Sequence, residues 1–448
     1  MAATKSRVLD MTRGAPLGLL LRFALPLFLG NLLQQFYNLA DTALAGHILG
    51  DAALAQIGAT SALYGLITNF AFGLNNGFAL TVSRHFGADD QPKLRQAVCW
   101  MLTLSALFAA VLTVGFLLPR RGLLAALQVP PEAMDGALAY LTVILAGIPL
   151  SMAYNLEASL LQAVGNSVTP LLLLLFSSVL NIGLDVWFMG PLGLGVRGAA
   201  VATILAQGVS AVLGGVYLLR RYRWLRFGRE AFAAPRPFVL GMLEAGLSMA
   251  LMSAIYNIGS VVLQSSINAL GQVYIAAQVG ARRLAELFYI PGLALGPSMA
   301  TYASQNYGAG QRRRIADGTK MALLLYFLWW LVAMAFTFTL AKPAMALVTG
   351  SHTPAVIDSA VLYMKISIPL IPPMAVLVVL RNVLQGMEHL IMPLLCSGLE
   401  LAGKVVFALW VVPVYGYPAV CVCEPFTWVV CFVFIVVGTV RCRDEFRD

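Results

Sequence analysis

Charged residues are scarce in this sequence. Only 11% of its 448 residues are Asp, Glu, Lys or Arg, whereas 60% are hydrophobic. Soluble domains carry about 25% charged residues, so this shortage excludes an ordinary soluble globular protein. It indicates a polytopic membrane protein with several apolar helices, and the lipid bilayer is therefore its first expected partner.

Motifs of catalysis and metal binding are also missing. The six cysteines form no CxxC pair, and the sequence contains no HExxH motif, no metal-spaced His/Cys cluster and no GxxxxGK[ST] phosphate loop. An enzyme is therefore disfavoured, and no cofactor is expected. Because no ATP site is present, any uphill transport must be driven by an ion gradient.

Twelve apolar runs long enough to span a bilayer follow one another along the chain. They fall at about residues 17–42, 52–80, 95–118, 136–163, 168–189, 197–219, 238–267, 273–302, 318–341, 357–386, 391–413 and 417–440. The predicted fold is an all-α polytopic membrane protein with twelve transmembrane helices.

Lys and Arg are distributed unevenly between the segments that connect these runs. With the N-terminus inside, twenty of the 29 lie in inner segments and four in outer segments. Cytoplasmic segments of membrane proteins carry such an excess. The bias predicts a multi-pass plasma-membrane protein with both termini in the cytoplasm. It also explains the net charge of +9 without a nucleic-acid partner.

The chain repeats itself at an offset of about 220 residues. Tyr37-Asn38 recurs as Tyr256-Asn257, and Ile148-Pro149-Leu150 recurs as Ile368-Pro369-Leu370. Each half contains six helices, and because six is even, the halves enter the membrane as parallel repeats. We predict an N-lobe at 1–219, a basic cytoplasmic linker at 220–237 and a C-lobe at 238–448. Transporters built this way bind substrate at the repeat interface.

A polar stripe crosses the first apolar run. Gln34, Tyr37, Asn38 and Asp41 are spaced i, i+3, i+4 and i+7, which places them on one helix face. A charged residue inside a membrane helix costs roughly 3 kcal/mol on insertion scales and usually marks a pathway. Asp41 is therefore a candidate cation-binding residue, or else an aspartate in a loop just beyond the helix. Pro26 in the same run is a hinge candidate, or else a helix-start proline.

The fifth apolar run contains a second acid. Asp185 follows Asn181 by four residues, so the two share a helix face. Together with Tyr37 and Asp41, they can form an oxygen-rich site for Na⁺ or a pair of carboxyl groups that carries a proton. The sequence leaves both readings open, together with a structural role for Asp185 as an anchor of its helix. No other metal site is expected.

Further polar residues within the runs are candidates for lining a substrate cavity or for bonding helix to helix. The cavity candidates are Gln34, Asn38, Tyr154, Asn155, Asn257 and Gln264. Two additional acids, Glu157 and Glu424, have no partner that the sequence identifies.

Spacing predicts two ion pairs in the second half. Glu286 follows Arg282 by four residues, and Lys404 follows Glu400 by four residues, which favours structural roles for both acids. The tenth run contains two bases, Lys365 and Arg381, either of which can repel a cation, pair with an acid or extend to the interface.

Three stretches carry a family resemblance: NLLQQFYNLADTALAGHILG, LLQAVGNSVTPLLLLLFSSVLNIGLDVWFM and QVGARRLAELFYIPGLALGPSMATYASQNYGAG. They resemble the multidrug and toxic compound extrusion (MATE) family over about residues 15–440. The resemblance implies two six-helix lobes in a V shape and cation-coupled antiport of organic cations or amphipathic drugs. It is closest to the DinF-like prokaryotic branch, in which acids of helices 1 and 5 bind H⁺ or Na⁺.

The resemblance also implies roles for single residues. The positions that match the coupling acids are Asp41 and Asp185, with Asn181 and Tyr37 beside them, and helix 1 is implied to bend near Pro26. The sequence departs from the family in two turns. Gln162 and Asn166 replace a frequent Arg and Asp, and Glu388 replaces a frequent Gly.

We therefore expect a secondary active multidrug efflux transporter. It would export small cationic or amphipathic molecules by alternating access, in exchange for H⁺ or Na⁺, and act as a monomer. One alternative is a flippase for a lipid-linked sugar or lipid, which would need a strongly cationic cavity. A polytopic membrane enzyme is the less expected alternative.

Overall fold

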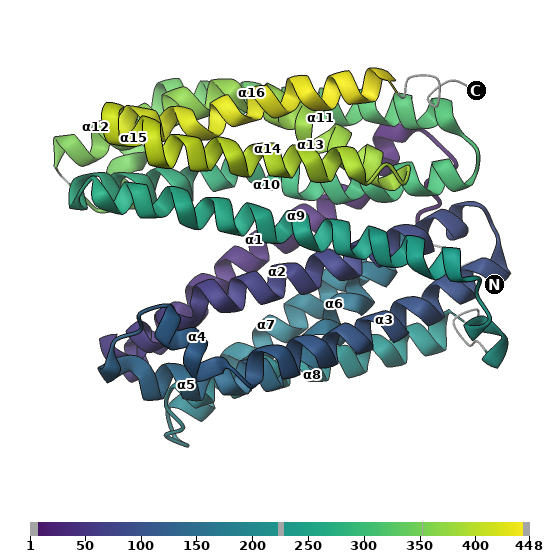
Figure 1. Cartoon of the computed structure of the whole chain (residues 1–448), viewed down its shortest axis with the longest axis horizontal. Helices are drawn as coiled ribbons and strands as arrows, with labels where there is room; N and C mark the ends of the chain where they lie inside the picture. The colour runs from purple at the N-terminus through teal and green to yellow at the C-terminus, as the bar shows by residue number, and fades with distance from the viewer. Residues whose placement is uncertain (1–7, 223–227, 352, 442–448) are drawn as a thin grey trace. The chain divides into compact units, whose positions relative to one another are not determined.

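The computed structural model consists almost entirely of long helices (Figure 1). It describes residues 8–222, 228–351 and 353–441, and these ranges contain no strand. Within them, ten helices are long and apolar enough to cross a membrane, and the bent pair α5 (Pro131–Ala146) and α6 (Ile148–Ala163) makes an eleventh span. The remaining predicted span is α10 (Gln272–Gly308), which is 37 residues long but less apolar. The all-helical fold is confirmed, and the count of twelve is approximately confirmed.

The other helices coincide with the apolar runs. They are α1 (Pro16–Leu49), α2 (Asp51–Gly87), α3 (Gln91–Leu117), α7 (Val168–Met189), α8 (Val196–Arg221), α9 (Arg236–Ala269), α11 (Arg312–Thr349), α12 (Pro354–Ser367), α13 (Ile371–Gly386), α14 (Ile391–Val406), α15 (Val412–Tyr415) and α16 (Tyr417–Arg441), with a short α4 (Arg120–Ala126). Several helices extend well beyond the predicted run, because hydropathy marks only the apolar part while the helix continues to the next turn residue.

Helix boundaries show the internal repeat directly. α1 and α9 both have 34 residues, and α2 and α10 both have 37 residues. Along the chain, α9 follows α1 at nearly the same interval at which α10 follows α2. The turns after α1 and α9 rest on Gly50 (φ +81°) and Gly271 (φ +97°), a backbone conformation that glycine adopts without steric cost. The halves therefore share their helix lengths and the turn after the first helix.

Packing divides the chain into two compact units. Unit 1 contains Leu25–Ala250 together with the residues up to Asp10, and unit 2 contains Met11–Ala24 together with the chain from Leu251 onward. α1 and α9 therefore each contribute to both units. The lobes at 1–219 and 238–448 stay a prediction, and residues 223–227 of the predicted linker lie outside the described residues.

Unit 1 is closed by a tight contact between α2 and the first half of α9. A Cβ atom added at Gly73 would lie 2.7 Å from the Cα atom of Ala250, and one added at Gly77 would collide with the carbonyl of Ala245. Two glycines four residues apart allow membrane helices to approach this closely. The start of α9 is thereby fixed against the helices that surround the site described below.

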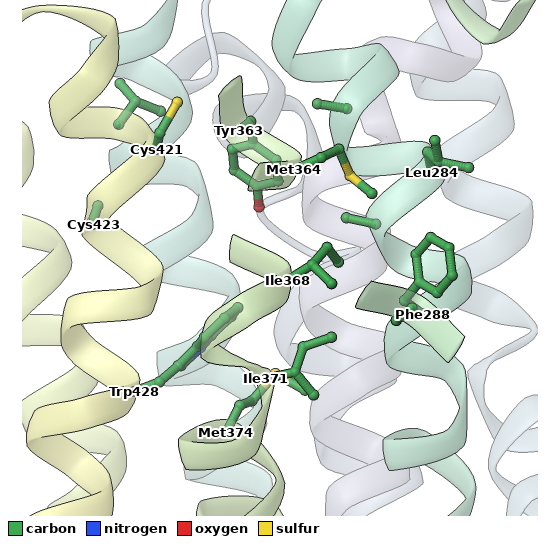
Figure 2. Packing of buried hydrophobic residues seen from close by; sticks show 14 of the residues in the cluster. Leu284, Phe288, Tyr363, Met364, Ile368, Ile371, Met374, Cys421, Cys423 and Trp428 are labelled. Carbon is green, nitrogen blue, oxygen red and sulfur yellow. The ribbon is translucent and has the colours of Figure 1, made fainter. Parts of the chain in front are cut away.

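Unit 2 is built around α10, α12, α13 and α16. Figure 2 shows Phe288, Ile368 and Trp428 in its apolar core, which includes the fully buried Tyr363 and Cys421. The residues before α1 that belong to this unit are held by polar contacts. The Met11 amide donates to Gln305 Oε1 at 3.0 Å, and the Met11 carbonyl accepts from Asn306 and Arg314.

Candidate cation site in unit 1

Two carboxyl groups meet inside unit 1. Asp41 lies in α1, eight residues before the helix ends at Leu49, so the alternative of a loop aspartate is wrong. Asp185 of α7 is fully buried. The two carboxyl groups are close enough for a direct side-chain hydrogen bond. Such a bond requires a proton on one of them, because ionised carboxylates only accept.

Asn181 fixes one side of this pair. Its amide satisfies both of its ends when the nitrogen donates to Asp185 Oδ2 at 2.9 Å and the oxygen accepts from the Thr203 amide at 3.1 Å. The spacing of four residues along α7 therefore places Asn181 beside Asp185, as predicted from the sequence. The amide presents a donor, and not its oxygen, to the carboxyl pair.

Thr203 of α8 joins the remaining members of the site. Its hydroxyl donates to the Ala199 carbonyl at 3.0 Å and is hydrogen-bonded to the Tyr37 hydroxyl. Tyr37 and Asp41 are four residues apart on α1, so both face this region. Asp41, Asp185, Asn181 and Tyr37 are therefore brought together, with Thr203 as the link between α1, α7 and α8.

A second polar layer extends from this cluster towards α6. The Tyr64 hydroxyl is hydrogen-bonded to Thr68 and Gln207, and Gln207 accepts from Ser151. Tyr64, Thr68 and Ser151 also line a cavity whose wall includes the predicted residue Asn155. The cavity has room for about one water molecule. A water molecule bound in this cavity would extend the polar layer from Tyr64 to Asn155.

Apolar side chains surround the carboxyl pair. Ala45 of α1, Ile144 of α5, Met189 of α7 and Ala200 of α8 are all buried in one cluster, together with the ring of Tyr140. Low polarity around two acids strengthens every electrostatic interaction between them. The pair therefore responds strongly to the arrival or loss of a single positive charge.

The other cavity candidates lie elsewhere. Gln34 donates to Asn38 at 3.1 Å along α1, on an exposed face. Asn257 donates to the Ser253 carbonyl and Gln264 donates to Asn268, both along α9 in unit 2. Tyr154 is on α6 close to Glu157. None of the contacts described for these residues joins them to the Asp41–Asp185 pair.

Pro26 lies inside α1, ten residues after the helix begins at Pro16, so the alternative of a helix-start proline is wrong. Proline has no backbone N–H and cannot bond to the carbonyl four residues earlier. The Arg22 carbonyl therefore lacks its helical partner. A hinge at this point stays a prediction.

The sequence reasoning did not identify Thr203, Gln207, Tyr64 and Tyr140. A signal was present for two of them. Thr203 and Gln207 are four residues apart in the apolar stretch ATILAQ, which is the spacing that identified Asn181 and Asp185. Tyrosines are common in membrane helices, and their spacing carried no such information for Tyr64 and Tyr140.

Two expected ion pairs in unit 2 have different outcomes. Lys404 Nζ lies 3.2 Å from Glu400 Oε1, which confirms that pair. Arg282 forms its ion pair with Glu424 of α16 at 3.1 Å, and within the described part of the chain Glu286 interacts with Arg282 electrostatically without a close ion pair. Interhelical partners cannot be read from spacing along one helix, and this is why Glu424 had no partner in the sequence.

Comparisons with known proteins identify the family to which this chain is similar in both of its halves. The MatE family model matches residues 26–187 and again 248–410, once in each half. The probable multidrug resistance protein YpnP of Bacillus subtilis is 29% identical over 307 residues, 68% of each chain. An FAD transporter of Shewanella oneidensis is 28% identical over 321 residues, 69% of each chain.

A solved structure shares the fold. A transporter of the MOP superfamily from Pyrococcus furiosus superimposes with a TM-score of 0.89 at 23% identity, over 99% of this chain and 100% of that chain. The relatives and the structural neighbour are transporters and not enzymes, and proteins of this kind bind small molecules in a membrane without an organic cofactor. The chain belongs to the MATE family of multi-pass multidrug efflux transporters.

Proposed function

We propose that this transporter is a proton-coupled antiporter in which Asp41 and Asp185 hold the coupling proton. The observation that carries the proposal is the proximity of the two carboxyl groups, which lie within reach of a side-chain hydrogen bond to each other. Two acids in contact bind a proton jointly, because their mutual repulsion disfavours the doubly ionised state. A proton is therefore the coupling ion that this geometry favours.

Sodium is the less suitable ion for this arrangement. A hard cation needs several oxygen ligands around it. Asn181 turns its nitrogen towards Asp185 and its oxygen towards the Thr203 amide, so the amide oxygen is not available as a ligand. Tyr37 is engaged with Thr203. The donor set that the sequence suggested for Na⁺ is thereby reduced to the two carboxyl groups.

In the proposed cycle, the acids interact with a cationic or amphipathic substrate until a proton neutralises one of them. Substrate and proton bind with opposing effects, which is the coupling that antiport requires. The name of YpnP supports a drug-like substrate. The FAD transporter carries, by its name, a dinucleotide with phosphate groups, so the substrate class is not restricted to cations. We also propose that the protein acts as a monomer with both termini in the cytoplasm.

The test uses purified protein in liposomes with ethidium as the transported dye. An imposed pH gradient should drive efflux, an imposed Na⁺ gradient alone should not, and Asp41→Asn should lower the pH-driven rate by at least roughly tenfold. Asp358→Asn is the matched control, because Asp358 forms an exposed pair with Lys342 and should leave the rate unchanged. Efflux driven by Na⁺ alone, or normal efflux by Asp41→Asn at equal protein content, would contradict the proposal.

A further inference from the structure

Glu157 of α6 is an acid without a close partner inside unit 1. The residue is partly exposed, but its Oε2 atom is buried and has no hydrogen-bond partner within the described ranges. A Cβ atom added at Gly214 of α8 would collide with this oxygen, and one added at Gly215 would lie 3.1 Å from Oε1. The carboxyl group therefore occupies a notch that two glycines leave on the surface of α8.

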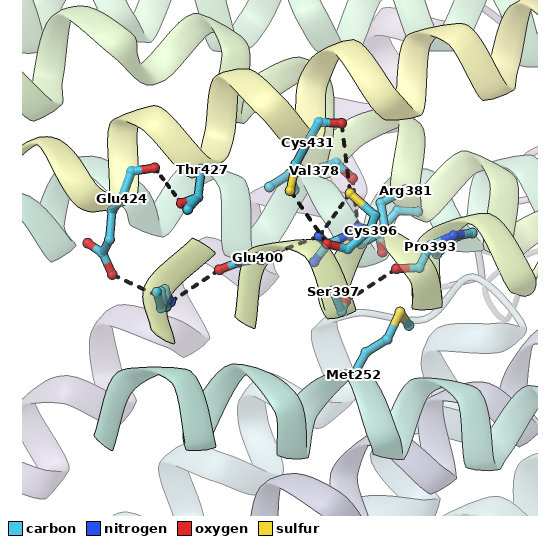
Figure 3. A network of polar contacts seen from close by, with 12 residues as sticks. Met252, Val378, Arg381, Pro393, Cys396, Ser397, Glu400, Glu424, Thr427 and Cys431 are labelled. Carbon is cyan, nitrogen blue, oxygen red and sulfur yellow. Dashed lines mark hydrogen bonds and ion pairs between the residues drawn. The ribbon is translucent and has the colours of Figure 1, made fainter. Parts of the chain in front are cut away.

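Two buried acids of unit 2 are instead compensated by bases. Glu424 of α16 forms an ion pair with Arg282 at 3.1 Å, and Glu400 of α14 lies 3.5 Å from Arg381. Lys404 joins the two acids, at 3.2 Å from Glu400 and 3.7 Å from Glu424. These residues form the charged network of unit 2, and Figure 3 shows both acids and Arg381 in it. The carboxyl group in the glycine notch differs from them, because the described part of the chain brings no base close to it.

The surroundings of this carboxyl group decide which form of it is stable. Tyr154, three residues earlier on α6, is the titratable group that interacts with it. α8 presents the two glycines, and Leu173 of α7 lies against the same notch. The described parts of α2, α3 and α5, which also pack on α6, bring no charged group close to it. Without a base nearby, the protonated form of a carboxyl group costs less free energy to bury than the ionised form.

One face of α8 leads from the candidate cation site to the notch. Its members are spaced four, three and four residues apart and are Thr203, Gln207, Ser210 and Gly214. Thr203 is hydrogen-bonded to Tyr37 of the candidate cation site. Each residue of a helix adds about 1.5 Å, so Gly214 lies about 16 Å further along α8 than Thr203. The notch is therefore about three helical turns away from the acid pair.

α6 runs beside this face in the same direction. Ser151 of α6 donates to Gln207, and Glu157, six residues later, meets Gly214, which is seven residues after Gln207. Nearly equal steps along two helices keep them in register, since both advance by about 1.5 Å per residue. The two helices therefore form one continuous seam between the polar layer around Ser151 and the carboxyl group of Glu157.

Hydroxyl groups occupy the middle of this seam. Tyr154 lies halfway between the two contacts on α6, and Ser210 lies nearly halfway between them on α8. The Ser210 Oγ atom is buried and has no hydrogen-bond partner among the described residues. Ser178 of α7, three residues before Asn181, has a buried hydroxyl group of the same kind. A hydroxyl group both donates and accepts, so such groups can pass a proton along the seam.

A polar chain continues from the notch to the turn between α6 and α7. Tyr217, three residues after Gly214 on α8, accepts from the Thr169 hydroxyl at 3.4 Å. Asn166, in the turn itself, donates to Thr169 at 2.9 Å and to the Tyr222 hydroxyl at 3.2 Å. With the N-terminus inside, as predicted, this turn faces the cytoplasm. The carboxyl group in the notch therefore lies between the acid pair and the inner end of unit 1.

The second half has no acid at the position of Glu157. The repeat of the Ile-Pro-Leu motif pairs Glu157 with Leu377, and the recurrence of Gln162 as Gln385 pairs it with Leu380. Either alignment places a leucine there. The acid is therefore not part of the frame that the two halves share, and it occurs in the half that contains the acid pair.

We propose that Glu157 is a second proton-binding residue, which receives the coupling proton from Asp41 and Asp185 and releases it at the turn between α6 and α7. The proposal rests on the proposed proton coupling and adds the inner proton site to it. The acid pair loses the proton and becomes ionised, and the Glu157 carboxylate becomes a neutral carboxyl group. Release of the same proton to water on the inner side restores the carboxylate.

The test compares driven and undriven ethidium transport by the whole protein in liposomes. Glu157→Gln keeps the shape of the side chain but cannot bind a proton. It should lower pH-driven efflux by at least about tenfold, because the proton can no longer leave through this carboxyl group. Exchange of ethidium at equal concentration and equal pH on both sides should keep its wild-type rate, because exchange requires no proton release.

Two further variants separate proton binding from a structural role. Glu157→Asp keeps an acid at this position and should retain part of the pH-driven efflux. Glu132→Gln, at an exposed acid of α5, is the matched control and should leave the rate unchanged. The melting temperature of Glu157→Gln should not fall below that of the wild type, because the change removes a buried acid that has no base.

A normal rate of pH-driven efflux in Glu157→Gln would overturn the proposal. An equal loss of driven efflux and of exchange would also overturn it, as would a loss of the same size in Glu132→Gln. If the wild type itself shows no pH-driven efflux, proton coupling at Asp41 and Asp185 is contradicted together with the inner site. A failure of the inner proton site alone can thus be distinguished from a failure of the proposed function.

Discussion

The two halves of this transporter share a helical frame and differ in the charge they place inside it. In unit 1, α7 presents Asn181 and Asp185 to a second acid, Asp41 of α1. In unit 2, the corresponding positions of α14 and the turn after it are Lys404 and Ala408. Helix lengths agree between the halves to the residue in α1 and α9 and in α2 and α10, so the frame tolerates either charge.

The two units also differ in how the charges of their buried acids are compensated. Glu424 and Glu400 in unit 2 have basic partners between 3.1 and 3.7 Å away. Asp41 and Asp185 have each other, an amide and an apolar surround. An acid with a fixed basic partner stays ionised, whereas an acid pair without a base can gain and lose a proton. We expect ion coupling in the first half for this reason.

The most severe change transfers the charge of one half to the other. Asn181→Lys would place an ammonium group four residues from Asp185, within reach of both acids, and fix them as an ion pair. We expect pH-driven ethidium efflux in liposomes to fall by at least roughly tenfold. Asn181→Ala, which removes only the amide contacts, should lower the efflux rate less than Asn181→Lys does. If Asn181→Lys still exports ethidium at the normal pH-driven rate, the difference in charge between the halves does not decide where the coupling proton binds.

Removing an acid from the charged network of unit 2 should lower the stability of the protein. Glu424→Gln removes the ion-pair partner of Arg282 and one of the two partners of Lys404, and breaking a buried ionic network costs about 3–5 kcal/mol. Thermal unfolding in detergent measures the loss. The double variant Glu424→Gln/Lys404→Asn should recover part of it, because its charges balance more closely again. Asp358→Asn is the exposed control and should cost less than about 1 kcal/mol.

A smaller effect is expected from the link between α1, α7 and α8. Thr203→Val keeps the shape of the side chain and removes the hydroxyl group that bonds to Tyr37. One hydrogen bond contributes about 1 kcal/mol. We expect a modest fall in melting temperature and slower ethidium efflux that still follows the pH gradient. An unchanged rate would show that Tyr37 is positioned by packing alone.

The smallest effect concerns two matching turns. Gly165 (φ +81°) follows α6, and Glu388 (φ +68°) follows α13 at the corresponding place in the second half. A side chain in this conformation costs about 1 kcal/mol, so Glu388→Gly should raise the free energy of unfolding by up to that amount. Gly165→Ala should lower it, because its Cβ atom would also collide with the Leu9 carbonyl. Chemical denaturation of the two variants measures both signs.

The sequence predicted the helices well because each span leaves a long apolar run, and the repeat supplied independent checks. It also grouped Tyr37 with Asp41 and Asn181 with Asp185, because regular spacing on one helix reports which side chains share a face. That these residues bind the coupling ion stays a prediction. Contacts between helices were not predictable in this way. Arg282 pairs with Glu424 across 142 residues of chain, and no local pattern encodes that partner.

The passage of α1 from one unit to the other also affects how the helix can deform. α1 leaves unit 2 after Ala24, and Pro26 removes the hydrogen bond of the Arg22 carbonyl at that place. α9 makes the corresponding passage after Ala250, and its proline, Pro237, lies far away at the start of the helix. Bending at this point would therefore break one backbone hydrogen bond fewer in α1 than in α9. We predict that the helix that carries Asp41 bends more easily there than α9 does.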